Sequence, residues 1–301
     1  MVQNSEEYRG MRPDSADASR GDEMKMQFTK MQGCGNDYIY FDCLQTPFPA
    51  DPAAASRRLS DRHFGIGGDG IVLILPSERA DFRMRIFNAD GSEAPMCGNA
   101  SRCVGRFVYT HGYTGKTAFT LDTNSGIKQI RIHEDPEIRL SVGVDLGRAS
   151  FVPEDVPAVL PCPPDAFTVN AEGIAYPAMA VSVGTAHCVI FTGKTVGFPL
   201  EETALRVTAA HFPQGVNTEI LLVEKDGITA RVYERGSGET MACGTGASAS
   251  VAAAVKRGLF PFDTPVPVHM PGGTITVTVA KDYSLLMEGA TAEVFTGTVD
   301  L

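Results

Sequence analysis

The chain has no lysine- or arginine-rich run, and its 36 acidic residues outnumber its 26 basic ones. A net charge of −10 and an isoelectric point near 5.1 argue against nucleic acid or an anionic membrane as a partner. No apolar run approaches the roughly 18–20 residues that a membrane-spanning helix needs, and the charged N-terminus is unlike a signal peptide. We therefore expect a cytoplasmic protein without a membrane segment.

The seven cysteines form no C-x-x-C pair and no regular framework. This pattern is typical of free thiols in a reducing compartment rather than of disulfides. Five of the cysteines are interpreted as structural residues of the core: Cys34, Cys43, Cys103, Cys162 and Cys188. The other two belong to a repeated motif.

The motif occurs once as NADGSEAPMCGNA, residues 88–100, and again as ERGSGETMACGTG, residues 234–246. Both copies have a polar residue nine positions before the cysteine, a glutamate four positions before it and a glycine directly after it. The two glutamates, Glu93 and Glu239, are interpreted as capping residues of the turns that contain them. A chance match of this quality is not expected.

The segments around the two motifs repeat as well. Residues 82–86 and 228–232 alternate between apolar and polar side chains, which predicts a strand before each motif. Residues 104–108 and 247–255 have apolar side chains at helical spacing, which predicts a helix after each cysteine. Each cysteine should therefore precede a helix N-terminus, where free N–H groups and the helix dipole favour anions and lower the pKa of a thiol.

Further landmarks recur in the same order, which indicates a duplicated domain. At 301 residues, 43% of them hydrophobic, the chain is long enough for two domains. We expect a disordered extension at 1–24, a first half at 25–145 and a second half at 146–289, with residues 290–301 able to return to the first half. The offsets are 149, 148 and 146 residues for the pairs Gly35 and Gly184, His63 and His211, and Cys97 and Cys243.

Two thiols on opposite walls of one cleft between the domains could act on both faces of one carbon. One thiolate would remove a proton from the carbon while the opposite thiol donated one to its other face. This inverts the configuration of the carbon without a cofactor. The N–H groups that follow each cysteine, in Gly98-Asn99 and Gly244-Thr245, could hold a substrate carboxylate.

A glycine-rich segment, residues 65–70, matches the G-x-G-x-x-G pattern of dinucleotide-binding proteins. That pattern requires a strand before it and a helix after it, whereas here the apolar run 71–75 predicts a strand after it. The segment is instead interpreted as a turn whose backbone approaches a neighbour closely.

Five stretches resemble the signature blocks of the diaminopimelate epimerase family, a group of cofactor-independent enzymes with two catalytic cysteines. The similarity runs in order through residues 25–301. The stretches are MQGCGNDYIYFD, RHFGIGGDG, RIFNADGSEAPMCGNASRC, VSVGTAHCVIF and VYERGSGETMACGTGASAS.

The resemblance implies an α+β fold of two pseudo-symmetric domains, each a curled, mostly antiparallel β-sheet around a central helix, with the active site in the cleft between them. It implies no cofactor and no metal. The implied catalytic residues are Cys97, Cys243, His187 and Glu234. The implied substrate contacts come from Asn36, Asn88, Gly98, Asn99, Asn217, Glu234, Arg235, Gly244 and Thr245.

Taken without the family, several of these residues have ordinary structural alternatives. The three asparagines suit turns, and His187 on an apolar strand could be a core residue. Arg235 has a separate physical argument, because its planar fork suits a second carboxylate.

The implied function is the conversion of LL- to meso-diaminopimelate, a small-molecule substrate on the route to lysine and peptidoglycan precursors. One alternative is a racemase of another amino acid with the same two thiols. Another is a non-catalytic binding or redox protein in which Cys97 and Cys243 form a disulfide. The oligomeric state is left open, including a homodimer.

Two positions depart from the family pattern. Family members commonly have GNPH where this chain has residues 184–187, GTAH, and some have glutamine at the position of Gly70. The family asparagine helps to hold the distal end of diaminopimelate, so Thr185 bears on the choice of substrate.

Overall fold

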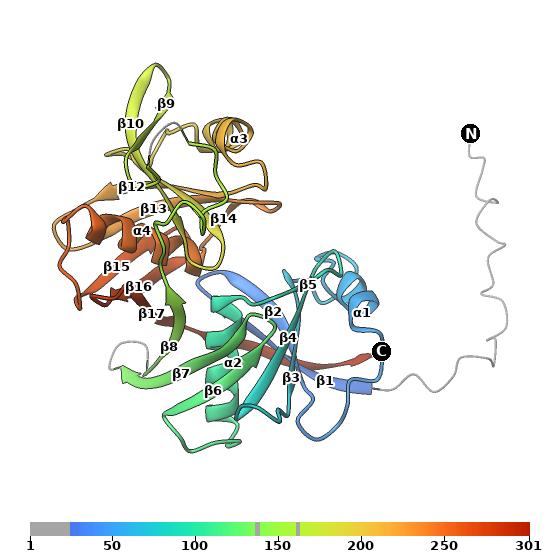
Figure 1. Cartoon of the computed structure of the whole chain (residues 1–301). Helices are drawn as coiled ribbons and strands as arrows, with labels where there is room; N and C mark the ends of the chain where they lie inside the picture. The colour runs from blue at the N-terminus through green and yellow to red at the C-terminus, as the bar shows by residue number, and fades with distance from the viewer. Residues whose placement is uncertain (1–24, 136–138, 161–162) are drawn as a thin grey trace, which may run out of the picture.

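The computed structural model describes residues 25–135, 139–160 and 163–301, which form two similar halves (Figure 1). The expected extension at 1–24 and the expected structural role of Cys162 lie outside the described residues. The first half contains β1 (Lys25–Gly33), β2 (Asn36–Asp42), α1 (Pro52–Leu59), β3 (Gly70–Leu75), β4 (Phe82–Asn88), β5 (Glu93–Ala94), α2 (Gly98–Thr110), β6 (Ala118–Thr123), β7 (Gly126–Asp135) and β8 (Arg139–Arg148). The second contains β9 (Phe167–Ala171), β10 (Ile174–Ser182), β11 (Ala186–Phe191), α3 (Leu200–His211), β12 (Asn217–Val223), β13 (Ile228–Glu234), β14 (Gly238–Thr240), α4 (Gly244–Lys256), β15 (Pro265–Met270), β16 (Gly273–Val279) and β17 (Ser284–Ala290), and β18 (Ala292–Asp300) follows.

The strands pair in the same order in both halves. The first half has the order β18-β1-β2-β3-β4-β6-β7-β8. The second half has the order β9-β10-β11-β12-β13-β15-β16-β17. The third and fifth pairings of each order are parallel, namely β2–β3 and β4–β6 in the first half and β11–β12 and β13–β15 in the second. The other pairings of both orders are antiparallel. The predicted α+β fold with mostly antiparallel sheets is confirmed.

One helix occupies the centre of each half. Strands β1, β2, β7 and β8 pack around α2, and β10 to β13, β15 and β16 pack around α4. Every residue of α4 except Thr245 and Lys256 is buried, and all the buried ones are glycine, alanine, serine or valine. Such small side chains let strands approach the helix closely from several sides. No helix among the described residues is long and apolar enough to cross a membrane.

The two sheets join where β8 pairs with β17. Val144 pairs with Met287, and these two residues occupy corresponding places, since they lie opposite Ile130 in β7 and Val277 in β16. The pseudo-two-fold axis of the duplication therefore passes through this pair. Strand β8 contains residue 145, where the sequence predicted the boundary between the halves.

The last strand returns to the beginning of the chain. Strand β18 pairs with β1 from Lys25 opposite Asp300 to Gln32 opposite Ala292, and Figure 1 shows the two running side by side. In the second half β9 occupies the corresponding place beside β10. On this pairing we propose that β18 completes the first domain.

Candidate active site

Both motif cysteines lie where the sequence predicted, directly before a helix. Cys97 precedes α2 and Cys243 precedes α4, and each has an extended backbone, with φ of −136° and −123° respectively. Strands β4 and β13 feed the two motifs, so the predicted strand, turn and helix are all present. The helices end shortly before Gly112 and Gly258, whose φ values of 76° and 72° favour glycine.

The expected capping role of the two motif glutamates is wrong. Glu93 lies in β5 and forms a two-pronged ion pair with Arg85, at 2.8 and 2.9 Å. Glu239 lies in β14 and does the same with Arg231, at 2.6 and 2.8 Å. Each motif folds back as a short strand on the one before it, which pairs Glu93 with Phe87 and Glu239 with Tyr233. Each glutamate thereby reaches the arginine two residues before its partner rather than the helix end. The helix start is left open for other groups.

The two helix starts meet in the middle of the molecule. Helices α2 and α4 touch, and the amide nitrogen of Asn99 donates to the carbonyl of Ala242 at 3.4 Å. A Cβ atom at Gly98 would lie 2.9 Å from Cε of Met287, and one at Gly244 would lie 2.6 Å from its sulfur. Glycine after each cysteine thus lets both helices approach the same residue on the pseudo-two-fold axis.

Cys97 is partly buried, and its thiol donates to Oδ1 of Asn36 at 3.4 Å. Burial raises the pKa of this thiol. The N–H groups of Ala100 and Asn99 and the charge of Arg102 work in the opposite direction, while the charge of Glu234 raises the pKa further. Since Glu234 belongs to the second half, charges from both halves act on this thiol.

Cys243 is buried, and its sulfur accepts from the N–H of Gly246 at 3.3 Å and lies 3.3 Å from the hydroxyl of Thr245. Burial, followed by the charges of Glu234 and Glu219, raises its pKa well above the usual value. The two thiols thus occupy equivalent places in the fold but have different electrostatic surroundings.

Glu234 ends β13 and accepts from the hydroxyl of Thr240 at 2.5 Å. Burial raises the pKa of its carboxyl, whereas hydrogen bonds from Thr240 and Cys243 lower it. A carboxyl with a raised pKa beside a thiol is suited to exchanging protons with it.

His187 is fully buried, and both ring nitrogens have partners. Nδ1 lies 2.7 Å from Oε1 of Glu219, and Nε2 lies 3.0 Å from the hydroxyl of Thr185. Glu219 is also fully buried, and its Oε2 has no hydrogen-bond partner among the described residues. Glu219 was not among the residues predicted from the sequence, although a carboxylate inside the apolar strand β12 is a usable signal.

Corresponding positions in the two halves carry different chemistry. The pairs are Tyr38 and His187, Val72 and Glu219, Asn88 and Glu234, and Arg102 and Ser248. Arg102 is fully buried, with nitrogens 3.3 Å from the sulfur of Met287 and 3.7 Å from that of Cys34. The buried cation therefore belongs to the first half, and the carboxylates of the buried Glu219 and the partly buried Glu234 belong to the second.

The other predicted substrate contacts are spread around this centre. Asn88 donates to Ser92 in its own turn at 3.0 Å, which fits the alternative of a turn residue. Oδ1 of Asn217 accepts from the N–H of Arg235 at 2.8 Å, so these two lie together. The guanidinium of Arg235 is exposed and donates to the carbonyl of Gln214 at 2.9 Å.

Comparison with known proteins gives the family. The model of the family described as diaminopimelate epimerase matches residues 28–152 and 179–294. This chain belongs to the diaminopimelate epimerase family. It is 44% identical over 283 residues to a diaminopimelate epimerase of Phocaeicola vulgatus, covering 92% of this chain and 99% of the relative. It is 41% identical over 288 residues to one of Agathobacter rectalis, covering 92% and 100%.

Solved structures of lower identity share the fold. A PhzF-family phenazine biosynthesis protein of Bacillus anthracis has a TM-score of 0.71 at 16% identity, covering 92% of this chain and 100% of that one. A hydroxyproline epimerase of Agrobacterium vitis has a TM-score of 0.64 at 17% identity, covering 92% and 93%. The predicted enzyme class, an isomerase of the diaminopimelate epimerase family, agrees with these findings.

The structure shows what surrounds Thr185 and Gly70, the two positions that depart from the family pattern. The hydroxyl of Thr185 contacts His187, so this position bears on the candidate catalytic histidine as well as on substrate choice. At Gly70, φ is 156° and any Cβ would overlap the carbonyl oxygen of Phe87. The backbone in this chain therefore excludes the glutamine that some members of the diaminopimelate epimerase family have there.

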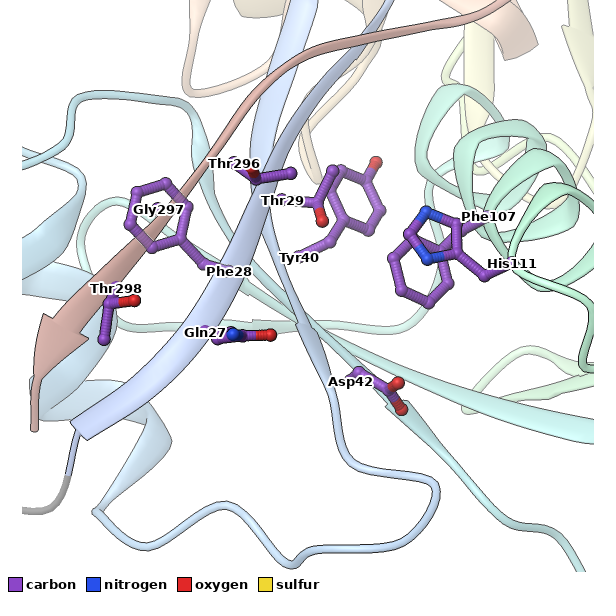
Figure 2. Close-up of a pocket in the computed structure, with 10 residues that line it drawn as sticks. All are labelled: Gln27, Phe28, Thr29, Tyr40, Asp42, Phe107, His111, Thr296, Gly297 and Thr298. Carbon is purple, nitrogen blue, oxygen red and sulfur yellow. The ribbon is translucent and has the colours of Figure 1, made fainter.

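A separate pocket of about 270 Å³ lies between β1, β2, β18 and the end of α2 (Figure 2). Phe28, Tyr40, Asp42 and His111 are among its lining residues, and neither motif cysteine lines it. The pocket is thus distinct from the site around the two helix starts.

Proposed function

We propose that this protein interconverts LL- and meso-diaminopimelate without a cofactor, on the route to lysine and peptidoglycan precursors. The observation that carries the proposal is the meeting of two helix starts, each preceded by a cysteine and each from a different half. Family membership supports the choice of substrate.

Cys97 and Cys243 are the acid/base pair in this proposal. One thiolate removes the α-proton from one face of the carbon, and the opposite thiol donates a proton to the other face. The helix N–H groups of Gly98, Asn99, Gly244 and Thr245 hold the α-carboxylate and stabilise the negative charge that develops as the proton leaves.

Glu234 and His187 act beside the thiols. Glu234 exchanges a proton with Cys243, which its hydrogen bond to that thiol supports. His187 is held in place between Glu219 and Thr185, through one ring nitrogen each.

The distal end of the substrate is held by the remaining polar groups. Arg235 suits the second carboxylate because its guanidinium is exposed and fork-shaped. Asn217 holds the backbone of Arg235, and Asn36 and Asn88 complete the substrate contacts.

The test is proton exchange and epimerisation of LL-diaminopimelate in deuterated water. We expect incorporation of deuterium at one α-carbon, and loss of epimerisation in both Cys97→Ala and Cys243→Ala, because each face needs its own thiol. Full turnover in either alanine variant would contradict the two-base mechanism.

A substrate panel separates the alternative function. Amino acids with a single carboxylate are assayed beside diaminopimelate in wild type and in Arg235→Ala. If the protein prefers such an amino acid and Arg235→Ala retains that activity, the racemase replaces the epimerase as the proposed function. We also place the enzyme in the cytoplasm, which the free cysteines among the described residues support.

A further inference from the structure

The glycine-rich loop before β3 passes unusually close to β2. A Cβ atom at Gly68 would lie 2.6 Å from Nζ of Lys30 and 3.0 Å from the carbonyl oxygen of Asp37. A side chain here would displace the end of Lys30 and press on the carbonyl of Asp37, so glycine suits the close approach that the sequence suggested for this segment. The next residue, Asp69, is thereby brought to the start of β2.

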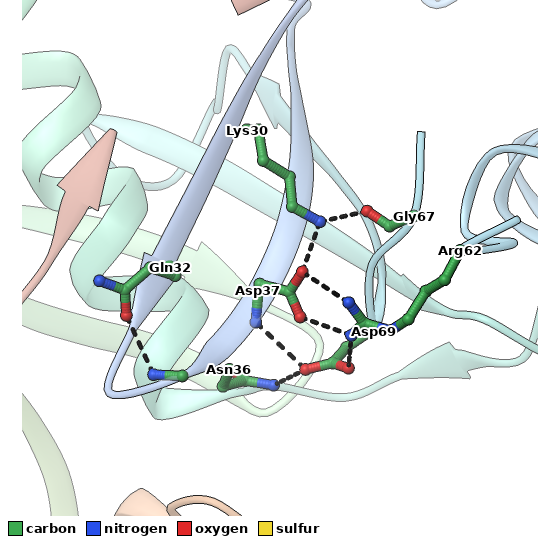
Figure 3. A network of polar contacts seen from close by, with 8 residues as sticks. Lys30, Gln32, Asn36, Asp37, Arg62, Gly67 and Asp69 are labelled. Carbon is green, nitrogen blue, oxygen red and sulfur yellow. Dashed lines mark hydrogen bonds and ion pairs between the residues drawn. The ribbon is translucent and has the colours of Figure 1, made fainter. Parts of the chain in front are cut away.

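Asp69 is held firmly at that place (Figure 3). Its Oδ1 accepts from Arg62 at 3.0 Å, and its Oδ2 accepts from the N–H of Asp37 at 3.1 Å. Arg62 also bridges to the carboxylate of Asp37 at 2.7 Å, and Lys30 pairs with the same carboxylate at 2.6 Å.

The same Oδ2 accepts from Nδ2 of Asn36 at 2.7 Å. An ionised carboxylate can only accept, so the amide nitrogen of Asn36 must face Asp69. The amide oxygen then faces the other way, where it accepts from the thiol of Cys97 at 3.4 Å.

We propose that Asp69 is a positioning residue for the epimerisation proposed above: by fixing the Asn36 amide, it presents an acceptor to the Cys97 thiol. An acceptor stabilises the protonated sulfur and directs its proton, whereas the opposite orientation would present a donor and favour the thiolate. The loop thus acts on the chemistry through two hydrogen bonds in series.

The two hydrogen bonds that connect Asp69, Asn36 and Cys97 have no counterpart in the second half. Thr185 occupies the place of Asn36 in the second half, and the buried apolar residue Val216 occupies the place of Asp69. Cys243 therefore lacks the corresponding amide and carboxylate, which adds to the difference between the two thiols.

Other charged or titratable groups also act on Cys97, and the test leaves them in place. Glu234 does so from β13, Arg102 from α2 and Tyr38 from β2, together with the N–H groups of Asn99 and Ala100. A change confined to Asp69 therefore alters only the acceptor of the Asn36 amide and the charge of Asp69 itself, and the variants below separate these two.

The experiment is Asp69→Ala, read by the pH dependence of Cys97 alkylation with iodoacetamide. Alanine removes the acceptor of Asn36, whereas Arg62 keeps its hydrogen bonds to the carboxylate of Asp37 at 2.7 and 3.2 Å. The freed Asn36 amide then rotates and presents its own nitrogen to the thiol. We expect Cys97 alkylation below its pKa to become about fivefold faster, the size of one modest hydrogen bond, and turnover to fall.

Two further variants make the result specific. Asp61→Asn removes a charge from the same loop, where its oxygen still accepts from His63 and Phe64, and should leave Cys97 alkylation unchanged. Asp69→Asn removes the same charge as Asp69→Ala but keeps an oxygen that accepts from Asn36 and from the N–H of Asp37, and should leave the alkylation profile close to wild type. An effect of the Asp69 charge alone predicts the same shift in both variants.

The alkylation rate is measured peptide by peptide and does not depend on turnover. Wild type without epimerase activity would therefore reject the proposed function and leave this test intact. If Asp69→Ala does not fold, Asp69→Val, with the residue type of Val216 in the second half, also removes the acceptor and should shift the profile in the same direction. A profile that stays unchanged or moves to higher pH in the folded variant without the acceptor, or an equal shift in Asp69→Asn, would overturn the positioning role.

Discussion

At the scale of single residues, the two cysteines occupy equivalent positions in the two halves, but the charged residues near them differ. At Cys97 the charge of Arg102 opposes that of Glu234, whereas at Cys243 the charges of Glu219 and Glu234 act together. Negative charge beside a buried thiol opposes its ionisation, and positive charge assists it. The thiol of Cys97 should therefore ionise at lower pH than the thiol of Cys243.

The first prediction concerns Glu219→Gln. Removing this charge removes a repulsion at Cys243, so the pKa of that thiol falls and its alkylation begins at lower pH. The hydrogen bond to His187 weakens at the same time, and a lost bond to a charged group costs roughly 1.5–3 kcal/mol, or about 10–150-fold in kcat/KM.

The matched control is Glu224→Gln, at an exposed carboxylate just beyond β12 that accepts from Thr229 at 3.1 Å. It should change neither the alkylation profile nor the rate. An unchanged Cys243 profile in a folded Glu219→Gln protein would show that Glu219 does not act on this thiol.

The second prediction separates two roles of Thr185 by steady-state kinetics. Thr185→Val removes the hydroxyl beside His187 and should lower kcat, whereas Thr185→Ser keeps the hydroxyl and should restore it. Thr185→Asn adds an amide for the distal end of the substrate and should lower KM with little change in kcat, as for a contact made equally in ground and transition states. A valine variant with wild-type kcat would leave only the role in substrate choice.

At the scale of elements, the glycine-rich loop and the two motif hairpins hold the site in place. The third prediction is that Gly70→Gln destabilises the fold by roughly 2–4 kcal/mol, in the range of strongly strained substitutions. Its side chain would overlap the carbonyl of Phe87, which pairs across from the start of β3.

Urea unfolding measures this cost. Gly112→Ala serves as the control, because its φ of 76° is similarly unfavourable but no atom lies within 4 Å of the added Cβ. We expect a loss of roughly 1–2 kcal/mol there. Equal losses in the two variants would mean that the contact with Phe87 relaxes at no cost.

At the scale of the whole molecule, the junction of β8 and β17 brings both helix starts to Met287. The fourth prediction is that oxidant inactivates the enzyme by linking Cys97 to Cys243 and that reductant restores activity, because two thiols that serve one carbon come within disulfide reach. Mass spectrometry identifies the pair. A link from either cysteine to Cys103 or Cys188 would contradict the proposed geometry.

The sequence by itself determined the duplication, the strand before each motif, the helix after each cysteine and the family. These features depend on local periodicity and on residues close together in the chain, which a pattern records directly. The same pattern could not distinguish a capping glutamate from one paired across a short hairpin, so the roles of Glu93 and Glu239 were predicted wrongly.

Only the tertiary structure decided which charges lie near each thiol. Glu219 and His187 are 32 positions apart and Asn36 and Asp69 are 33 apart, yet each pair shares a hydrogen bond. Parallel pairing between strands separated by a helix and a loop creates both contacts, and no local pattern encodes the register of such a pair. The duplicated motifs gave the two halves the same backbone, and long-range packing gave their thiols different surroundings.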